Sequence, residues 1–271
     1  MDVLIGSKGY IGSHLSSNLK ERLVPFISIP SRDDFYRNME LLHDQDIRTV
    51  YWCAAAFLPN STTMGALKGI PEFEFLCNSV KKNFPRANIV LLSTNGLVDY
   101  KLGSQNDSPR SIYFENRFGY EQTLAKMECP GVVLRLSNVY GPNVSNQYGV
   151  IASWTRNIQR KQPIIVTDSL NSSRDYIYVS DVVDAILAAS RVIDGQILDV
   201  GCGSSVSLSQ LMALFNEILD FKAEYLTDRG AILASRKPKL RLSSTQSAIG
   251  WSPSISLREG LELTFKNEGL L

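Results

Sequence analysis

The stretch Val3-Leu4-Ile5-Gly6-Ser7-Lys8-Gly9-Tyr10-Ile11-Gly12 decides the expected fold, because it has the pattern of a strand, a glycine loop and the start of a helix. Its glycines follow the pattern G-x-x-G-x-x-G. The first permits a tight turn, the second lets a pyrophosphate approach the backbone, and the third lets the helix pack closely on the strand. The N–H groups at such a helix start favour phosphate. We therefore expect the loop from Gly6 through Ser7, Gly9, Tyr10 and Ile11 to Gly12 to bind a dinucleotide, the alternative being a purely structural turn.

Short apolar runs alternate with amphipathic segments in the first half of the chain. They predict strands at 3–5, 24–29, 49–55, 88–93 and 131–136, and helices at 11–22, 73–83 and 117–127. This alternation predicts an α/β fold with a Rossmann-type, doubly wound parallel sheet and helices on both faces. Further on, the same criteria predict helices at 151–160, 181–190, 208–219 and from about 257, and strands at 164–166 and 197–200. We expect residues 1–141 to form mainly a dinucleotide-binding domain and residues 142–271 mainly a smaller substrate-binding lobe, some of whose elements return to the first sheet.

The composition of the 271 residues limits the classes of function. Apolar residues make up 44% and charged residues 20%, as in ordinary globular proteins, and a net charge of +1 does not predict binding to nucleic acid or to a membrane surface. No apolar run approaches the roughly 20 residues that span a bilayer, and the N-terminus does not resemble a signal peptide. The four cysteines lack paired or metal-ligand spacing, and only two histidines occur. We therefore expect free thiols, no metal site and a cytoplasmic location.

The residues after the second expected strand bear on which dinucleotide binds. An acidic residue there usually binds the ribose 2′-hydroxyl of NAD, but the position holds Pro30. Ser31 and Arg32 follow, and a hydroxyl beside a guanidinium suits a 2′-phosphate. We predict NADP, with NAD as the alternative, because Asp33 or Asp34 could pair with Arg32 or bind the ribose from another angle.

Several further motifs occur in a fixed order along the chain. They are Cys53-Ala54-Ala55-Ala56, Ser93-Thr94, the run LRLSNVYGP at 134–142, RDYIYVSDV at 174–182, DVGCG at 199–203, IGWSP at 249–253 and LREGL at 257–261. Together with the glycine loop they resemble the extended short-chain dehydrogenase/reductase family, in its NAD(P)-dependent nucleotide-sugar epimerase/dehydratase/reductase branch. The resemblance runs nearly from end to end. It implies cofactor contacts at Ala54, Ala55 and Ser93, and a nucleoside-diphosphate sugar as the substrate.

The chemistry of that family depends on a tyrosine and on a lysine four residues later. The tyrosine is the acid/base, the lysine lowers its pKa and holds the ribose, and a serine or threonine completes the donor set. The matching Ser/Thr is Thr94. Judged from Gly119, the matching pair is Phe118 and Gln122. That register would place Phe118 against the substrate and Gln122 against the cofactor, with no proton or charge to contribute.

Two nearby tyrosines could replace the missing acid/base. Tyr113 and Arg117 have Tyr-x-x-x-Arg spacing and could be the pair in a shifted register. Tyr120 is a second candidate, although it should point to another face of the helix. Relatives often form homodimers through a helix bundle that includes this helix, and Leu124 and Met127 could serve as contacts.

The resemblance also implies which residues bind the diphosphate of the sugar nucleotide. Asn138 and Arg174 occupy the matching positions, and Arg241 could also meet phosphate. An arginine fork suits a diphosphate. The alternatives are that Arg174 forms a salt bridge to Asp175 or Asp181, and that Asn138 bonds its own turn.

Three functions are consistent with the sequence. The first is an NADP-dependent oxidoreductase or epimerase of nucleoside-diphosphate sugars, with a 4-keto-sugar reductase as the specific prediction. The second is a protein that binds both ligands without catalysis, which the pair Phe118 and Gln122 favours. The third is an epimerase or lyase that uses another residue.

Overall fold

The computed structural model places most of the chain in two compact units. It describes residues 1–31, 34–35, 38, 42, 45–54, 69–99, 109–144, 149–192, 194–220, 224–227 and 240–271. The first unit comprises Met1–Leu136, Val183–Val200 and Arg241–Trp251, and the second comprises Ser137–Val182, Gly201–Leu240 and Ser252–Leu271. The sites predicted at Arg32 and Ala55 lie outside the described residues.

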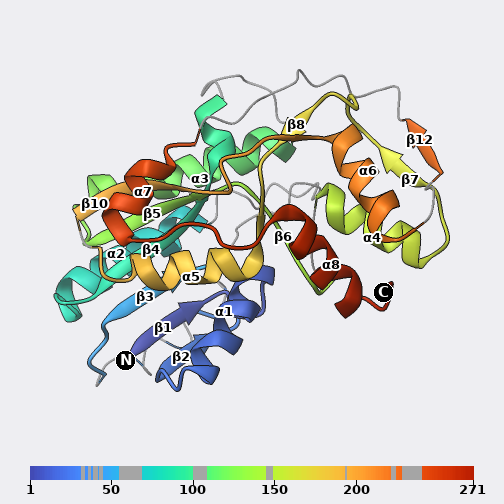
Figure 1. Cartoon of the computed structure of the whole chain (residues 1–271). Helices are drawn as coiled ribbons and strands as arrows, with labels where there is room; N and C mark the ends of the chain where they lie inside the picture. Colours follow the sequence, from blue (N-terminus) through green and yellow to red (C-terminus); the bar gives the residue numbers. More distant parts are fainter. Residues whose placement is uncertain are drawn as a thin grey trace. The chain divides into compact units, whose positions relative to one another are not determined.

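The first unit is built on a six-stranded sheet in which every neighbouring pair is parallel (Figure 1). Across the sheet the strands are β10 (Asp194–Val200), β5 (Gly131–Leu136), β4 (Asn88–Thr94), β3 (Thr49–Trp52), β1 (Asp2–Ile5) and β2 (Phe26–Ile29). The predicted α/β fold with a parallel Rossmann-type sheet is confirmed. β2 lies on one side of β1 and β3 on the other, so the strand order reverses direction at β1. Ligands of open parallel sheets bind at the carboxyl ends of the strands next to such a reversal.

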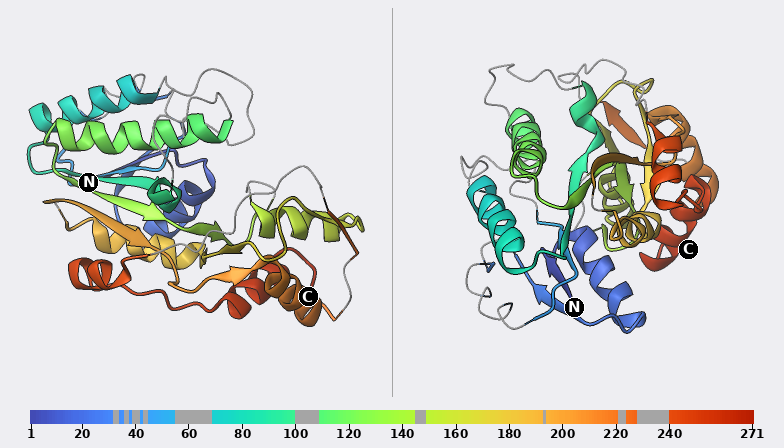
Figure 2. Two further views of the ribbon diagram at one scale, coloured as in Figure 1. Left: turned by 90° about the horizontal axis from the view of Figure 1, so that it is seen from above. Right: turned by 90° about the vertical axis from the view of Figure 1, so that its left-hand side faces the viewer.

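Helices cover both faces of this sheet (Figure 2). On one face lie α2 (Gly69–Asn83) and α3 (Pro109–Lys126), and on the other lie α1 (Tyr10–Glu21) and the part of α5 (Val179–Ala189) that belongs to this unit. Arg22 at the end of α1 pairs with Asp184 of α5 at 3.0 Å. A short 3-10 helix, η3 (Asn95–Asp99), follows β4, and α7 (Leu242–Ile249) is held to β10 by a hydrogen bond from Thr245 Oγ1 to the Asp199 carbonyl at 2.7 Å.

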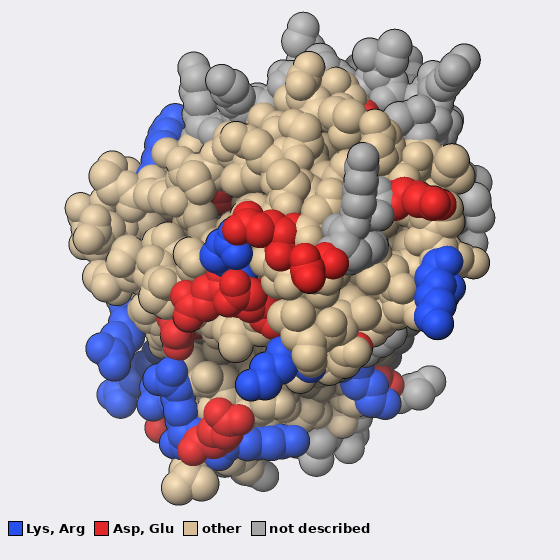
Figure 3. All heavy atoms as spheres, turned by 45° about the vertical axis from the view of Figure 1, so that its right-hand side comes forward, with Lys and Arg blue, Asp and Glu red and all other residues tan. Residues whose placement is uncertain are grey.

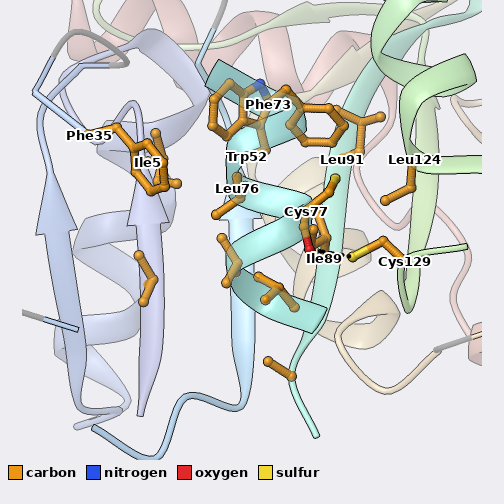
Figure 4. Close-up of a cluster of buried hydrophobic side chains, with 14 of the residues drawn as sticks. Ile5, Phe35, Trp52, Phe73, Leu76, Cys77, Ile89, Leu91, Leu124 and Cys129 are labelled. Carbon is orange, nitrogen blue, oxygen red and sulfur yellow. Dashed lines mark hydrogen bonds between the residues drawn. The ribbon is translucent and has the colours of Figure 1, made fainter. Parts of the chain in front are cut away.

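The core of the first unit lies between the sheet and the helices α2 and α3. Figure 4 shows Trp52 of β3 beside Phe73 of α2, and Cys77 beside Cys129. The rings of Trp52 and Phe73 meet edge to face with centroids 5.0 Å apart. Apolar side chains that alternate with helical and strand periods fill this layer, so burial of apolar surface is the main stabilising term here. All four cysteines are free thiols.

In the part of the second unit that the structure describes, helices combine with short pairs of strands, and the first residues of α5 also belong to this unit. The helices are α4 (Val150–Gln159), α6 (Leu208–Ile218) and α8 (Leu257–Asn267). The pairs are β6 (Asn138–Tyr140) with β9 (Tyr176–Tyr178), β8 (Ser173–Arg174) with β11 (Val206–Ser207), and β7 (Ile164–Val166) with β12 (Tyr225–Thr227). Its core includes Trp154, Phe215 and Phe265. A capping box of Ser207 and Gln210 begins α6.

The surface charges agree with the small net charge of the sequence. On the face drawn in Figure 3, acidic and basic side chains lie interspersed. No helix in the described part of the chain is both long and apolar enough to cross a membrane. Within the same residues, no group of three or more His, Cys, Asp or Glu side chains is arranged to hold a metal ion.

Candidate active site

The glycine loop connects the carboxyl end of β1 to α1 in the conformation that its glycines permit. Gly6 has a φ of +88°, and a Cβ there would lie 2.7 Å from the backbone nitrogen of Ala54, which follows β3. A Cβ at Gly12 would collide with the Gly6 carbonyl, so the start of α1 packs directly on the loop. Gly9, the N-cap of α1, is exposed, makes no side-chain cap, and is followed by no acidic residue in the first turn. The start of α1 therefore suits an anion.

The other predicted members of the loop differ in how they could contact a cofactor. Tyr10 and Ile11 begin α1 and are half-buried, and the Tyr10 ring meets His14 edge to face at 5.1 Å. Ser7 is buried and faces β2, because its Oγ accepts a hydrogen bond from Ser28 Oγ at 2.8 Å and its N–H donates to the Ile29 carbonyl at 3.2 Å. The side chain of Ser7 thus helps to fix the loop.

The end of β2 carries an acidic group that the NADP prediction did not place. Ser31 Oγ donates to Asp34 Oδ2 at 2.6 Å. While that bond holds, the Ser31 hydroxyl does not donate to a 2′-phosphate, and a carboxylate at this point repels one. This contact favours NAD over NADP, and binding of a 2′-phosphate by Ser31 stays a prediction. The charge expected to favour NADP belongs to Arg32, which lies outside the described residues.

The carboxyl end of β4 presents two neighbouring hydroxyls with different functions. Thr94 Oγ1 accepts a hydrogen bond from the Gly96 N–H at 3.3 Å, which leaves the threonine proton free to be donated. Ser93 is buried, and its Oγ donates to Glu121 Oε1 at 2.5 Å. The Ser93 hydroxyl proton is thus used to hold α3, and binding of the cofactor by Ser93 stays a prediction.

The side chains of α3 that meet the end of β4 are those of Arg117 and Glu121. Arg117 is buried, and its Nη1 donates to the Leu92 carbonyl at 2.9 Å. Its guanidinium carbon lies 5.3 Å from the centre of the Tyr113 ring, one turn earlier on the helix. Glu121, one turn later, accepts the Ser93 proton. Tyr113 and Arg117 therefore form the tyrosine–cation pair with the family's spacing.

This geometry favours a different register from the one inferred from Gly119. Successive residues of a helix point about 100° apart, so Phe118 and Gln122 are rotated away from the face that carries Arg117 and Glu121. Gln122 is exposed and Phe118 is half-buried. Contact of Phe118 with the substrate and of Gln122 with the cofactor stay predictions, and the bonds of Arg117 and Glu121 to β4 favour the shifted alternative.

Tyr120 lies in the apolar core of the first unit. It is 0% exposed, and its ring meets Trp52 and Phe73 edge to face with centroids 5.8 and 5.2 Å apart. The candidate catalytic role of Tyr120 is therefore corrected, since a ring enclosed in this cluster does not reach a substrate.

Cys53, which follows β3, is half-buried. Burial raises the pKa of its thiol to about 12, against the opposite effect of the nearby Arg117 cation. The thiol is therefore neutral at physiological pH and is not a nucleophile there.

In the second unit, Arg174 is held by a partner that the sequence did not indicate. Its Nη2 pairs with Asp168 Oδ2 at 2.6 Å, and its Nη1 donates to the Ser173 carbonyl at 2.9 Å. The partners considered from sequence, Asp175 and Asp181, instead accept hydrogen bonds from the backbone N–H groups of residues 202 and 255. The arginine is 27% exposed, so the ion pair orients a fork that still reaches the surface.

Asn138 and Arg241 each donate a hydrogen bond to an aspartate. Asn138 is exposed, and its Nδ2 donates to the Asp175 carbonyl at 2.9 Å, across the β6–β9 pair. Arg241 is the exposed N-cap of α7 in the first unit, and its backbone N–H donates to Asp199 Oδ2 at 2.8 Å. Their binding to a diphosphate stays a prediction.

A cavity of about 330 Å³ opens in the second unit, close to Arg174 in the chain. Tyr176, two residues later, forms part of its wall together with Cys202, Ser204, Val206 and residues 253–257. Burial raises the pKa of both the Tyr176 phenol and the Cys202 thiol, the latter to about 12, so both are neutral. Apolar walls with a few polar groups are typical of small-molecule sites.

Sequence reasoning named Arg117 only as the partner of Tyr113 in a shifted register, and it missed Glu121 and Asp168. The signal for Glu121 was present in the sequence, because Glu121 follows Arg117 by four residues. The structure adds that Arg135 lies opposite Ser93 in the β4–β5 register. The spacing Tyr-x-x-x-Arg-x-x-x-Glu with a matching strand arginine favours the register at 113 and 117. Asp168 had no such signal.

The chain is similar to a known protein family and to relatives that it matches over nearly their whole length. Residues 95–201 match the NAD dependent epimerase/dehydratase family. The chain is 30% identical to a protein of Methanocaldococcus jannaschii assigned as a UDP-glucose 4-epimerase, over 97% of this chain and 96% of the relative. It is 23% identical to the dTDP-4-dehydro-6-deoxyglucose reductase of Escherichia coli, over 98% and 96%.

The fold also matches that of solved structures. MoeE5 in complex with UDP-glucuronic acid and NAD superposes with a TM-score of 0.80 at 21% identity, and the match covers 99% of this chain and 98% of MoeE5. Since a full-length relative at 30% identity, a family match and the fold agree, the chain belongs to the NAD-dependent epimerase/dehydratase family, in the nucleotide-sugar branch of the extended short-chain dehydrogenases/reductases.

Proposed function

We propose that the chain is an NAD(P)-dependent reductase of a 4-keto nucleoside-diphosphate sugar, with Tyr113 as the proton donor. The observation that carries the proposal is that the Arg117 guanidinium lies 5.3 Å from the centre of the Tyr113 ring. The same guanidinium donates to the Leu92 carbonyl of β4, and Thr94 lies at the end of that strand. These are the parts of a general-acid site. The E. coli reductase with similarity along the whole chain supports the reaction type.

Three residues of the first unit, Tyr113, Arg117 and Thr94, have separate roles in the proposed reaction. When bound, the nicotinamide dinucleotide supplies the hydride. Tyr113 Oη gives its proton to the sugar oxygen as the carbonyl becomes an alcohol, and the Arg117 cation stabilises the phenolate left behind. Thr94 donates a hydrogen bond to the same oxygen, because the hydrogen bond that the described residues make with its Oγ1 is accepted from the Gly96 N–H and leaves its own O–H to donate. Hydrogen-bond donors aimed at a developing oxyanion lower the barrier.

The dinucleotide would bind at the glycine loop. Gly6 and Gly12 bring the backbone and α1 together, and Gly9 leaves the helix start without a side-chain cap. These features fit a pyrophosphate. Arg32 is the basis for proposing NADP, whereas the Asp34 carboxylate beside Ser31 favours NAD.

The second unit would bind the nucleotide part of the substrate. Arg174, oriented by Asp168, offers its fork to the diphosphate. The cavity lined by Tyr176 and Val206 has room and apolar walls for a nucleoside. A site of this kind binds many activated sugars through their common nucleotide, so the sugar itself must be found by experiment.

The proposal is tested by oxidation of NADH and of NADPH, followed at 340 nm, with a panel of UDP- and dTDP-linked 4-keto sugars. We expect oxidation with at least one sugar and a faster rate with one of the two dinucleotides. Interconversion of UDP-glucose and UDP-galactose without net oxidation would instead identify an epimerase. Binding of dinucleotide and sugar nucleotide without turnover across the panel would contradict the proposal and identify a binding protein.

A further inference from the structure

The carboxylate of Glu121 is a buried charge at the contact between α3 and the sheet. Its side chain is 4% exposed. Oε1 accepts hydrogen bonds from Ser93 Oγ at 2.5 Å and from Arg135 Nε at 3.0 Å, and Oε2 accepts one from Arg135 Nη2 at 2.6 Å. Ser93 and Arg135 are direct neighbours in the β4–β5 register. A single carboxylate thus joins one helix to two strands, with directional bonds to each.

The same helix is fixed to β4 at a second point, one turn earlier. Arg117 Nη1 donates to the carbonyl of Leu92, the residue before Ser93. Two consecutive residues of the strand therefore hold two residues of the helix that lie four positions apart. Side chains at this spacing share one helix face. Together the two contacts fix both the rotation of α3 and its position along its axis.

Rotation of α3 decides which side chains face the end of β4. A slip of one residue turns the helix by about 100° and would exchange Arg117 for Phe118. Apolar packing against α2 and the sheet is not directional. The bonds of Glu121 are directional, and replacement of such a buried ion pair by apolar residues is often tolerated without loss of stability. A stabilising role alone therefore gives no reason for a charge at this position.

We propose that Glu121 is the positioning residue of the Tyr113–Arg117 pair, acting through Ser93 and Arg135. The inference rests on the proposed function for the identity of that pair. Ser93, Thr94 and the bond to Leu92 lie within three consecutive residues of β4, so the bonds that hold α3 also set the distance between Tyr113 and the Thr94 hydroxyl. Glu121 itself need not touch either ligand.

The test compares Glu121→Gln with a matched control in the same unit. Asp2 is also a buried carboxylate, 2% exposed, which accepts hydrogen bonds from Arg48 and from the Tyr51 hydroxyl at the amino end of β1. Asp2→Asn therefore removes a comparable ionic contact at the opposite ends of the strands. Ser93→Ala serves as a milder variant, because it leaves the Arg135–Glu121 pair in place.

Measurements of kcat, KM and the pH dependence of kcat decide the proposal. We expect Glu121→Gln to lower kcat about 10- to 100-fold, as misplacement of a reacting group by about 1 Å can do. The alkaline limb of its pH profile should move in the same direction as in Arg117→Gln, and Ser93→Ala should show a smaller change of the same sign. Asp2→Asn should keep kcat and the pH profile. The proposal is overturned if Glu121→Gln retains both within twofold, or if Asp2→Asn changes them equally.

A second readout does not require turnover. NMR spectra of protein with 13C-labelled tyrosine rings, with the Tyr113 signal assigned by Tyr113→Phe, report whether the guanidinium still lies over the ring. The signal should move in Glu121→Gln as it does in Arg117→Gln, and not in Asp2→Asn. A signal unchanged in Glu121→Gln would sink the positioning claim even in an active enzyme. If no sugar nucleotide is reduced but the signal moves as expected, only the proposed function fails.

Discussion

Arg117 gives the first unit a cation with a different geometry from that of a lysine. A guanidinium is planar, stays charged at all physiological pH values and donates in several directions at once. Here one N–H group is bonded to the Leu92 carbonyl, and the cation also lies over the Tyr113 ring. The arginine can therefore serve the fold and the proposed chemistry together, because its donors do not compete for one position.

The ion pair of Asp168 with Arg174 leads to a prediction about substrate binding. Asp168→Asn removes the charge that orients Arg174, so the guanidinium is less often oriented to form two hydrogen bonds with a diphosphate. We expect KM for the sugar nucleotide to rise roughly tenfold with kcat unchanged, the signature of a loss of ground-state binding. Steady-state kinetics measures this. Glu217→Gln, which removes the exposed partner of Arg258 in the same unit, should change neither constant.

Cys53 leads to a prediction about reactivity. Because burial raises the pKa of its thiol to about 12, the thiolate is a minute fraction at pH 8 and grows only as the pH approaches that value. We expect iodoacetamide to modify Cys53 far more slowly than free cysteine at pH 8, and the rate to keep rising up to the most alkaline pH at which the fold survives. Peptide mass spectrometry measures the rate. Labelling as fast as that of free cysteine would contradict the raised pKa.

Element by element, the strands and helices that carry strong periodicity were predictable. The expected strand at 131–136 coincides with β5, and most other elements differ by a few residues at their ends. α7 and the strands of two or three residues in the second unit, such as β8 and β11, were not predicted. Strands this short bury too few alternating side chains to show a period. Their pairing depends on contacts distant in sequence.

The candidate site was predictable to different degrees in its two halves. The conformation of the glycine loop could be predicted, because it depends on the backbone freedom of glycine and the positions of the glycines are read from the sequence. The register of α3 could not, because its apolar residues are spread around the helix and Gly119 matched the family motif in a frame that the contacts of α3 do not favour. The helix also begins at Pro109, eight residues before its expected start at 117. Only the bonds of Arg117 and Glu121 to β4 show which face meets the sheet.

The packing of α1 on the glycine loop leads to a prediction at the scale of an element. Gly12→Ala places a Cβ against the Gly6 carbonyl, which cannot retreat because Gly6 lies against Ala54. We expect dinucleotide affinity to fall at least about tenfold, measured by fluorescence titration. As a control, Ser207→Ala removes the capping box of α6 and should cost about 1 kcal/mol of unfolding free energy with no change in affinity. Equal affinities in Gly12→Ala and the parent would contradict this packing.

For the molecule as a whole, the division into two units predicts two separable effects of ligands on stability. A dinucleotide at 100 times its Kd should raise the free energy of unfolding by about 2.7 kcal/mol. Gly6→Ala should abolish this shift, because residue 6 has a φ of +88°, but should keep the shift caused by a sugar nucleotide. Arg174→Gln should do the reverse. Thermal unfolding with each ligand measures both, and a full dinucleotide shift in Gly6→Ala would contradict the assigned site.

The homodimer implied by the family resemblance stays a prediction, but one of its expected contacts is wrong. Leu124 is 3% exposed and belongs to the core between α3 and the sheet. A partner subunit therefore does not meet it unless the fold opens.

The central claim is that Tyr113, and not position 118, transfers the proton. Its most direct measurement is kcat for the reduction of a 4-keto sugar nucleotide by Tyr113→Phe and by the triple variant Tyr113→Phe/Phe118→Tyr/Gln122→Lys, which restores the family motif in the other register. We predict that Tyr113→Phe loses about two to four powers of ten in kcat and that the triple variant recovers none of it. Recovery of activity in the triple variant, or full activity in Tyr113→Phe, would contradict the account.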